Sequence, residues 1–317
     1  MSDSPLLSIV TPTRGNFSSF WLDHLLAIKG NIEFILVYYP NTPHQAIADE
    51  RVRQITSPYK GEFLQRIVGL LNTKGDYILA LDDDDFIHPQ IYALTLDYFQ
   101  RFPDSIVLRP RLKRIDYQNI TALHSEWQSI PALDSLTVAR RTEAETRTTT
   151  LQEIPIAPLN KSFDFRFLIW PFLRRRDMEG AHLENFNNKV WKNTVVQQIV
   201  PEICQASRFF GAITWIPTSG LDRVLALHIQ AKIFSEGAII GHWMPIPEQV
   251  RFADKNPALK PPRFHLESVV LLMRNYPQYG YFWNLLFEQI YAVPKAMAKL
   301  LKWKFLKKPG TSTQKAK

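Results

Sequence analysis

Short apolar runs and stretches with helical spacing alternate along the first third of the chain. Uninterrupted apolar runs bounded by turn residues indicate strands, and apolar residues three and four positions apart indicate helices. The predicted strands are residues 6–11, 32–39, 51–56, 77–81 and 105–108. The predicted helices are residues 18–29, 61–72 and 90–102. This alternation favours βαβ units, so we predict an α/β fold whose sheet is mostly parallel and flanked by helices.

The pattern is weaker in the rest of the chain, and residues 109–158 receive no assignment. Residues 163–172 are aromatic and precede three arginines, which indicates a buried strand or, alternatively, a wall for a sugar and a phosphate. The remaining elements are expected as helices at 184–201 and 224–234, a short strand at 238–240 and an apolar, aromatic stretch at 268–293. We divide the chain into a catalytic body at 5–250, a helical, basic extension at 251–308 and a disordered tail at 309–317.

Four consecutive carboxylates, residues 82–85, directly follow the predicted strand 77–81. An unpaired buried carboxylate costs far more than the roughly 1.5–3 kcal/mol that burying one apolar side chain contributes, so all four are expected outside the core. They then lie at the carboxyl edge of the sheet, where α/β proteins bind ligands. Adjacent carboxylates raise one another's pKa unless a cation shares the site, and oxygen ligands suit Mg²⁺ or Mn²⁺. The alternative is a solvated acidic loop before a helix that His88 and Pro89 open.

Residues 74–85, KGDYILALDDDD, resemble the donor-site signature of family 2 glycosyltransferases. Upstream, Gly61, Arg66 and Gly69 match the same family pattern. The resemblance is strong over residues 6–90. It implies a GT-A fold of Rossmann-like type and an inverting transferase that takes a sugar from a nucleotide-diphosphate sugar with the help of Mn²⁺ or Mg²⁺.

The resemblance also implies roles for individual residues. Asp82 and Asp84 are expected to bind the metal, with His242 as a third ligand, and Asp222 is expected to be the general base at the start of a helix. The donor-binding set that the resemblance implies is Thr11, Pro12, Arg14, Arg66, Asp82 and Asp83. Each has an alternative: a surface arginine at 14 or 66, an ordinary helix start at 222 and a structural histidine at 242.

Two positions depart from the family pattern. Tyr38 and Tyr39 stand where the family often has an acidic pair that holds the base, and Leu221 stands where it has a glutamate. Either tyrosine stacks on a base or packs on the core. The departures keep open a non-catalytic carbohydrate-binding or scaffold protein that retains the fold. A sugar-phosphate nucleotidyltransferase could use a related α/β sheet and paired carboxylates, although no Gly-rich phosphate loop is visible near the first strand.

The charge of the chain lies mostly at its C-terminal end. The formal net charge is +8, and residues 295–317 hold eight lysines and no acidic residue. The body is therefore not basic, and we do not expect nucleic acid as a partner. A basic, Trp-bearing helix suits an anionic membrane surface, reached through Lys295–Lys308, and a solvated tail is the alternative.

The expected location is cytoplasmic, peripheral on the inner face of the membrane. The single cysteine, Cys204, forms no internal disulfide, and the N-terminus lacks the pattern of a signal peptide. The expected acceptor is a saccharide or glycolipid, in the synthesis of cell-surface polysaccharide or glycolipid.

Overall fold

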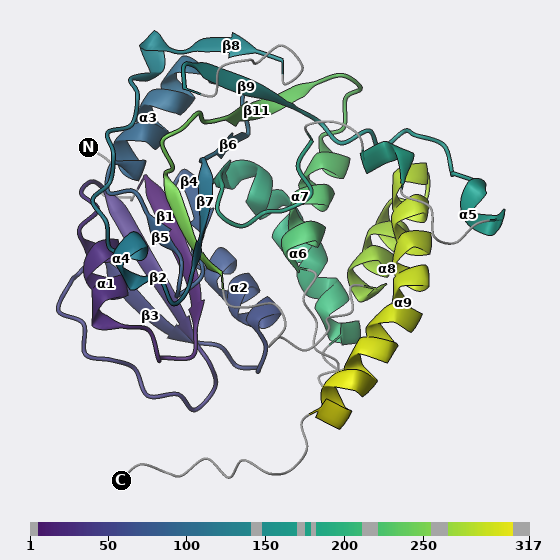
Figure 1. The fold of residues 1–317 in the computed structure, drawn as a ribbon, viewed down its shortest axis with the longest axis horizontal. Helices are drawn as coiled ribbons and strands as arrows, with labels where there is room; N and C mark the ends of the chain where they lie inside the picture. The colour runs from purple at the N-terminus through teal and green to yellow at the C-terminus, as the bar shows by residue number, and fades with distance from the viewer. Residues whose placement is uncertain are drawn as a thin grey trace.

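The computed structural model describes residues 6–140, 148–169, 175–178, 182–210, 221–254 and 266–306. Its strands form a nine-stranded sheet in the order β3-β2-β1-β4-β10-β6-β11-β9-β8 and a three-stranded sheet in the order β5-β12-β7 (Figure 1). The strands are β1 (Leu7–Thr13), β2 (Ile32–Tyr38), β3 (Val52–Thr56), β4 (Tyr77–Ala80), β5 (Phe86–Ile87), β6 (Val107–Arg109), β7 (Leu112–Asp116), β8 (Thr137–Ala139), β9 (Thr150–Pro155), β10 (Val190–Lys192), β11 (Ile239–Trp243) and β12 (Val250–Asp254). Five of the eight pairings in the larger sheet are parallel, which confirms a mostly parallel sheet.

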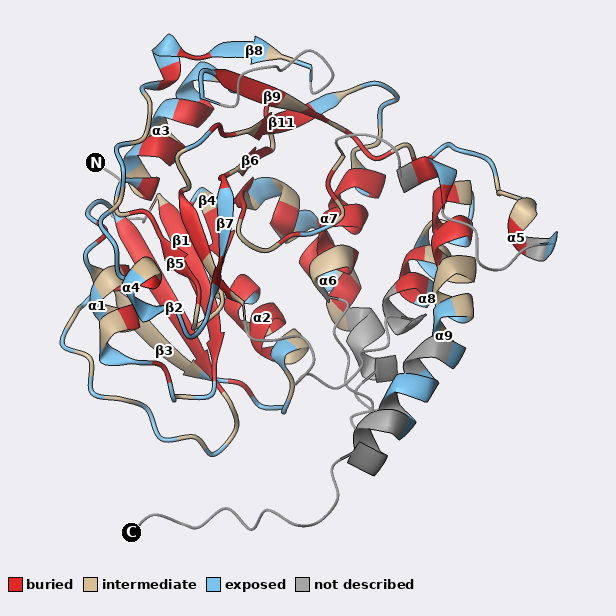
Figure 2. Ribbon diagram, viewed as in Figure 1, coloured by how far each residue is buried: buried red, intermediate tan, exposed pale blue. Residues whose placement is uncertain are grey.

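Helices cover both faces of the larger sheet, as the sequence predicts. The helices are α1 (Ser19–Leu26), α2 (Glu62–Leu71), α3 (Ile91–Arg101), α4 (Ile120–Leu123), α5 (Arg166–Ile169), α6 (Asn193–Phe210), α7 (Leu221–Lys232), α8 (Leu266–Asn275) and α9 (Gly280–Leu306). Apolar residues of α1 and α3 share one core cluster with one face of the strands, and those of α2, α6 and α7 share a second cluster with the other face. The central strands are accordingly buried along most of their length (Figure 2).

Helix α2 lies unusually close to β1. A Cβ atom at Gly69 would lie 2.3 Å from Cγ1 of Val10, so this position requires a glycine. One turn earlier, Nε2 of Gln65 donates to the carbonyl oxygens of Thr13 (2.8 Å) and Val37 (2.6 Å). The start of α2 is thereby fixed beneath the ends of β1 and β2.

The C-terminal region is helical, as expected, and packs on the sheet's helical layer. Leu227 of α7, Val269 of α8 and Phe282 of α9 belong to one buried cluster. Arg175, whose side chain is fully buried, pairs with Asp177 (2.7 Å) and reaches Glu288 of α9 (3.5 Å). The boundary at residue 250 stays a prediction, and the predicted tail at 309–317 lies outside the described residues.

Two predicted elements are wrong in type. Residues 190–192, predicted as helix, form β10, which pairs antiparallel with both β4 and β6, and α6 begins only at Asn193. Val190 and Trp191 are fully buried there because both faces of this strand are covered. The aromatic stretch at 163–172 contains α5 rather than a strand, since Phe167 packs towards Tyr291 of α9 instead of a neighbouring strand. The last three residues of that stretch lie outside the described part of the chain.

Candidate active site

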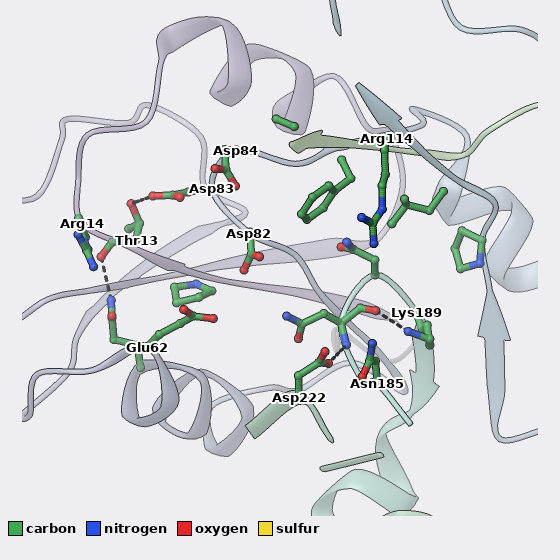
Figure 3. A pocket seen from close by; sticks show the side chains of 18 of the residues that line it. Thr13, Arg14, Glu62, Asp82, Asp83, Asp84, Arg114, Asn185, Lys189 and Asp222 are labelled. Atoms are coloured by element: carbon green, nitrogen blue, oxygen red, sulfur yellow. Dashed lines mark hydrogen bonds between the residues drawn. The ribbon is translucent and has the colours of Figure 1, made fainter. Parts of the chain in front are cut away.

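A cavity of about 780 Å³ opens at the carboxyl edge of the larger sheet. Its lining comes from the ends of β1, β4, β6 and β11, from the starts of α2 and α7, from the loop at 185–189 and from β7 and β12 of the small sheet (Figure 3). Parallel strands end at one edge, so the polar residues that follow each of them meet here. The small sheet adds a wall above this edge.

Three of the four consecutive carboxylates line the cavity. Asp82, Asp83 and Asp84 all face it, in agreement with their expected position after β4. Oγ1 of Thr13 donates to Oδ2 of Asp83 (2.7 Å) and accepts from the backbone N–H of Gly15 (2.9 Å). The acidic loop is therefore tied to the turn that follows β1.

The fourth carboxylate, Asp85, corrects the expectation that all four lie outside the core. Its side chain is fully buried, and Oδ2 accepts a hydrogen bond from Nδ2 of Asn188 (2.9 Å). Its carbonyl oxygen accepts from Nε1 of Trp21 (2.8 Å). Burial raises the pKa of Asp85 well above its ordinary value, and the charges of Asp82 and Asp84 add to this. A carboxyl group that retains its proton avoids most of the cost of burying a charge, which is why it can enter the core.

Arg66 supports the acidic loop from below. Its guanidinium is buried and pairs with Asp82 and with Oε1 of Glu62 (3.1 Å). Burial opposes the charge of Arg66, but the neighbouring carboxylates outweigh it and raise its pKa. Burial also raises the pKa of Asp82 to about 6, with Arg66 opposing and Glu62 and Asp84 adding to the rise. Carboxylates thus outnumber cations at this end of the cavity.

The structure separates the six predicted donor-binding residues into two groups. Pro12, Arg14, Asp82 and Asp83 line the cavity, and the guanidinium of Arg14 lies 5.9 Å from the ring centroid of Tyr39, which also lines it. Thr11 is buried within β1, and Arg66 lies behind Asp82, so neither is part of the lining. Of the two tyrosines, Tyr39 is the one that faces the cavity, while Tyr38 is buried in the core.

Asp222, the predicted base, lines the cavity near the start of α7. Its Oδ1 accepts backbone hydrogen bonds from Phe186 and Asn187, both 2.5 Å long. These two bonds hold the carboxylate in one orientation. In Figure 3, Asp222 lies on the opposite side of the cavity from Thr13 and Asp83.

His242 does not join the other predicted metal ligands. Side chains alternate along β11, and His242 points to the face that α3 covers, where Nδ1 lies 2.9 Å from the hydroxyl of Tyr98. Its ring also packs on Phe102, with centroids 4.3 Å apart. Burial lowers the pKa of His242 to about 4. The neighbouring residue, Trp243, is the one that lines the cavity.

Several lining residues were not predicted from the sequence, and Lys189 is the most unusual of them. Lys189 is buried, and Nζ donates to the carbonyl oxygen of Asn187 (2.9 Å). Burial lowers its pKa to about 8, and the charge of Arg109 acts in the same direction while Asp222 opposes it. It was missed because residues 184–201 were predicted as a continuous helix. Glu62 was also missed, although its place one helical turn before Arg66 is a usable signal.

The donor set fits a divalent cation that binds together with a diphosphate. Within the described part of the chain, no group of three or more His, Cys, Asp or Glu side chains could hold a metal ion. Mg²⁺ in nucleotide sites is usually held by one or two carboxylates, with phosphate oxygens and waters completing its shell. Asp82 and Asp84 meet that need. Burial is the main cause of the raised pKa of Asp82, and the charges of Glu62 and Asp84, which a cation would offset, add to it.

Comparison with protein families finds a match to part of the chain. Residues 39–162 match the model described as glycosyl transferase family 2. The resemblance to family 2 glycosyltransferases is confirmed. This family 2 segment contains the acidic loop and Arg66, whereas Arg14 and Asp222 lie outside it.

Comparison with curated proteins gives no match. Among solved structures, the chain is similar to Staphylococcus aureus TarS 1–349 in complex with UDP-GlcNAc, with a TM-score of 0.48 and 13% identity over 95% of this chain and 73% of that one. TarS 1–349 in complex with UDP gives the same TM-score and identity, with 95% of this chain and 72% of that one covered. TarS 1–349 alone gives a TM-score of 0.47 and 12% identity over 98% and 75%.

Proposed function

We propose that this protein is an inverting glycosyltransferase that uses a nucleotide-diphosphate sugar together with Mn²⁺ or Mg²⁺. The observation that carries the proposal is that the acidic loop of the family 2 segment and Asp222, which lies outside the segment, face each other across one cavity. Charge on a leaving diphosphate and a proton on an acceptor hydroxyl need different groups on two sides of a sugar. The cavity offers both.

In this proposal the donor occupies the half of the cavity near β1. Tyr39 and Arg14 offer an aromatic ring and a cation for the nucleotide, and Asp82 and Asp84 hold the metal beside the diphosphate. The bound cation would supply Lewis-acid stabilisation of the charge that develops on the leaving group. Asp83 also faces the donor half, and its bond to Thr13 holds the loop in place.

The reaction has one bond-breaking and one bond-forming event at the anomeric carbon. The bond to the phosphate oxygen breaks and its electron pair leaves with the nucleoside diphosphate, while an acceptor oxygen bonds to the opposite face of the sugar. Asp222 receives the proton of that acceptor hydroxyl. The two backbone N–H groups at Oδ1 keep the carboxylate in position for this transfer.

Calorimetric titration of UDP and GDP, with and without Mn²⁺, tests the donor site. We expect one of them to bind in a metal-dependent way and Asp84→Ala to weaken that binding by about tenfold or more. Asp97→Ala, which removes an exposed carboxylate of α3, is the matched control and should bind as the wild type does. Absence of nucleotide binding, or binding that Asp84→Ala leaves unchanged, would contradict the proposal.

The described part of α9 favours a position on a membrane surface. Its exposed apolar side chains, Trp283, Ile290, Met297 and Leu301, follow one another at intervals of seven, seven and four residues and so share one side of the helix. The C-terminal lysines lie in and after the same helix in sequence. We propose that this side of α9 rests on an anionic membrane, where a glycolipid acceptor would be met. No helix in the described ranges is long and apolar enough to cross a bilayer.

A further inference from the structure

The half of the cavity away from the nucleotide side is basic. Three cations line it: Arg109 at the end of β6, Arg114 on β7 and Lys189 just before β10. Figure 3 shows Arg114 and Lys189 on the side opposite Thr13 and Arg14. The cavity is therefore divided into an acidic half that suits a metal and a basic half that needs a different ligand.

Lys189 is the clearest sign of what this half binds. Only 8% of its surface is exposed, and among the described residues no carboxylate forms an ion pair with it. Its hydrogen bond to the carbonyl of Asn187 does not neutralise its charge. Asp222 favours the charged form of Lys189 in part, and a ligand anion in the cavity would offset the remaining cost of burying the ammonium.

Arg109 makes a cation–π contact with Trp243. Its guanidinium lies 4.0 Å from the ring centroid of Trp243, and that of Arg111 lies 3.9 Å from the same centroid. The N–H groups of a guanidinium lie in its plane and suit the two oxygens of a carboxylate or phosphate. The contact with Trp243 holds the guanidinium of Arg109 at the edge of the cavity.

The position of Asp222 limits where an anion can lie. Asp222 and Lys189 are close enough that the charge of the first acts on the pKa of the second. A ligand anion would be repelled by Asp222 and attracted by Lys189, Arg109 and Arg114. A ligand that reaches Asp222 and the three cations at once therefore places a neutral hydroxyl at Asp222 and its negative charge against the three cations.

We propose that the acceptor carries an anionic group, a phosphate or a carboxylate, which Lys189, Arg109 and Arg114 bind while its hydroxyl meets Asp222. This inference rests on the proposed function, because it names the acceptor of that same site. In the proposed function the donor diphosphate does not account for these cations, since a cation held by Asp82 and Asp84 would neutralise it in the acidic half.

Three probes based on glucose, two with an anionic group at carbon 6 and one neutral, test the inference. Glucose 6-phosphate, glucuronate and methyl glucoside are titrated into protein saturated with UDP and Mn²⁺, so that the donor site is already filled. We expect at least one charged probe to bind about tenfold or more tightly than methyl glucoside. The stronger of the two charged probes distinguishes a phosphate from a carboxylate on the acceptor.

Variants connect the binding to the basic half. Arg114→Ala removes a side chain that is 75% exposed, so its loss should leave the fold intact, and Lys189→Met removes the buried charge. Each substitution should weaken the binding of the charged probe by about tenfold and leave the affinity for UDP unchanged. Lys113→Ala is the matched control, because Lys113 is adjacent to Arg114 on β7 and carries the same charge but does not line the cavity.

Each other outcome has a separate meaning. Equal binding of the neutral and charged probes, or charged-probe binding that both variants leave unchanged, would overturn the inference. A loss of UDP affinity in Lys189→Met and Arg114→Ala would also overturn it, because the cations would then serve the donor diphosphate. Failure of UDP to bind the wild type counts against the proposed function alone, and the same probe titration without UDP still decides whether the basic half is an anion site.

Discussion

Arg66 and Asp82 form an ion pair across the floor of the cavity, with 2% of the arginine side chain exposed and 32% of the aspartate. The cation is inside the protein and the carboxylate reaches the site. Arg66 therefore does not line the cavity, and its predicted role in donor binding stays a prediction. It keeps one of the candidate metal ligands charged and oriented.

Replacing Arg66 by Met should destabilise the protein. The change leaves Asp82 beside Glu62 and Asp84 with no cation, so we expect the free energy of unfolding to fall by about 3 kcal/mol in urea titrations. Arg114→Met, at an exposed position, should change it by no more than about 0.5 kcal/mol. Equal effects of the two substitutions would show that the buried pair is not important for stability.

Metal-dependent nucleotide binding should weaken in acid. The pKa of Asp82 is raised to about 6, so its carboxylate is ionised above pH 6 and takes up a proton as the pH falls through that value. About one tenth of it is ionised at pH 5, and we expect roughly tenfold weaker Mn²⁺-dependent UDP binding at pH 5 than at pH 7.5. Calorimetry across this range checks the prediction, and the same pH dependence in Asp82→Asn would assign it to another group.

Asp85→Asn should stabilise the protein, and more so at higher pH. A carboxyl group with a raised folded-state pKa binds a proton more readily in the folded state, so its contribution to stability falls as the pH rises above its ordinary value. The amide keeps the shape and an oxygen that can accept from Asn188. We expect the Tm to rise by about 2 °C at pH 8 and to change little at pH 4. A stabilisation independent of pH would contradict the assigned cause.

Asp222→Asn should abolish chemistry without affecting donor binding. The amide oxygen can still accept the N–H groups of Phe186 and Asn187, so the local fold should persist. With water as acceptor, we expect hydrolysis of the nucleotide sugar to slow by about 10²–10⁴-fold while UDP affinity stays unchanged. Undiminished hydrolysis in the variant would exclude Asp222 as the base.

The exposed side of α9 should determine binding to anionic vesicles. Replacing Ile290 and Met297 together by Glu removes apolar area and adds repulsive charge. In sedimentation assays we therefore expect the affinity for phosphatidylserine-containing vesicles to fall by at least about tenfold. Ile120→Glu changes an exposed isoleucine on α4, away from α9, and serves as the control. Membrane binding that survives the double substitution would place the contact elsewhere.

The sequence determined the part of the fold and site that depends on neighbouring residues. Unbroken apolar runs identified β1, β2 and β4, and carboxylates that directly follow β4 had to lie at its end. Gly69 could also be singled out from the sequence, because it matches the family pattern. In the structure it lies where α2 comes close to β1. The alternation of side chains and the cost of burying a charge depend on neighbouring residues, so both can be assessed from the sequence alone.

Only the tertiary structure decided which distant residues share the cavity. The three residues of β10 were predicted to be helical. Their position between β4 and β6 places the preceding residue, Lys189, at the cavity. On β11, the choice between His242 and Trp243 depends on which face α3 covers. Asp85 lies in the core beside Asn188, over 100 residues away in the chain, which donates a hydrogen bond to it. Each outcome depends on contacts between segments far apart in the chain, and local periodicity carries no information about such contacts.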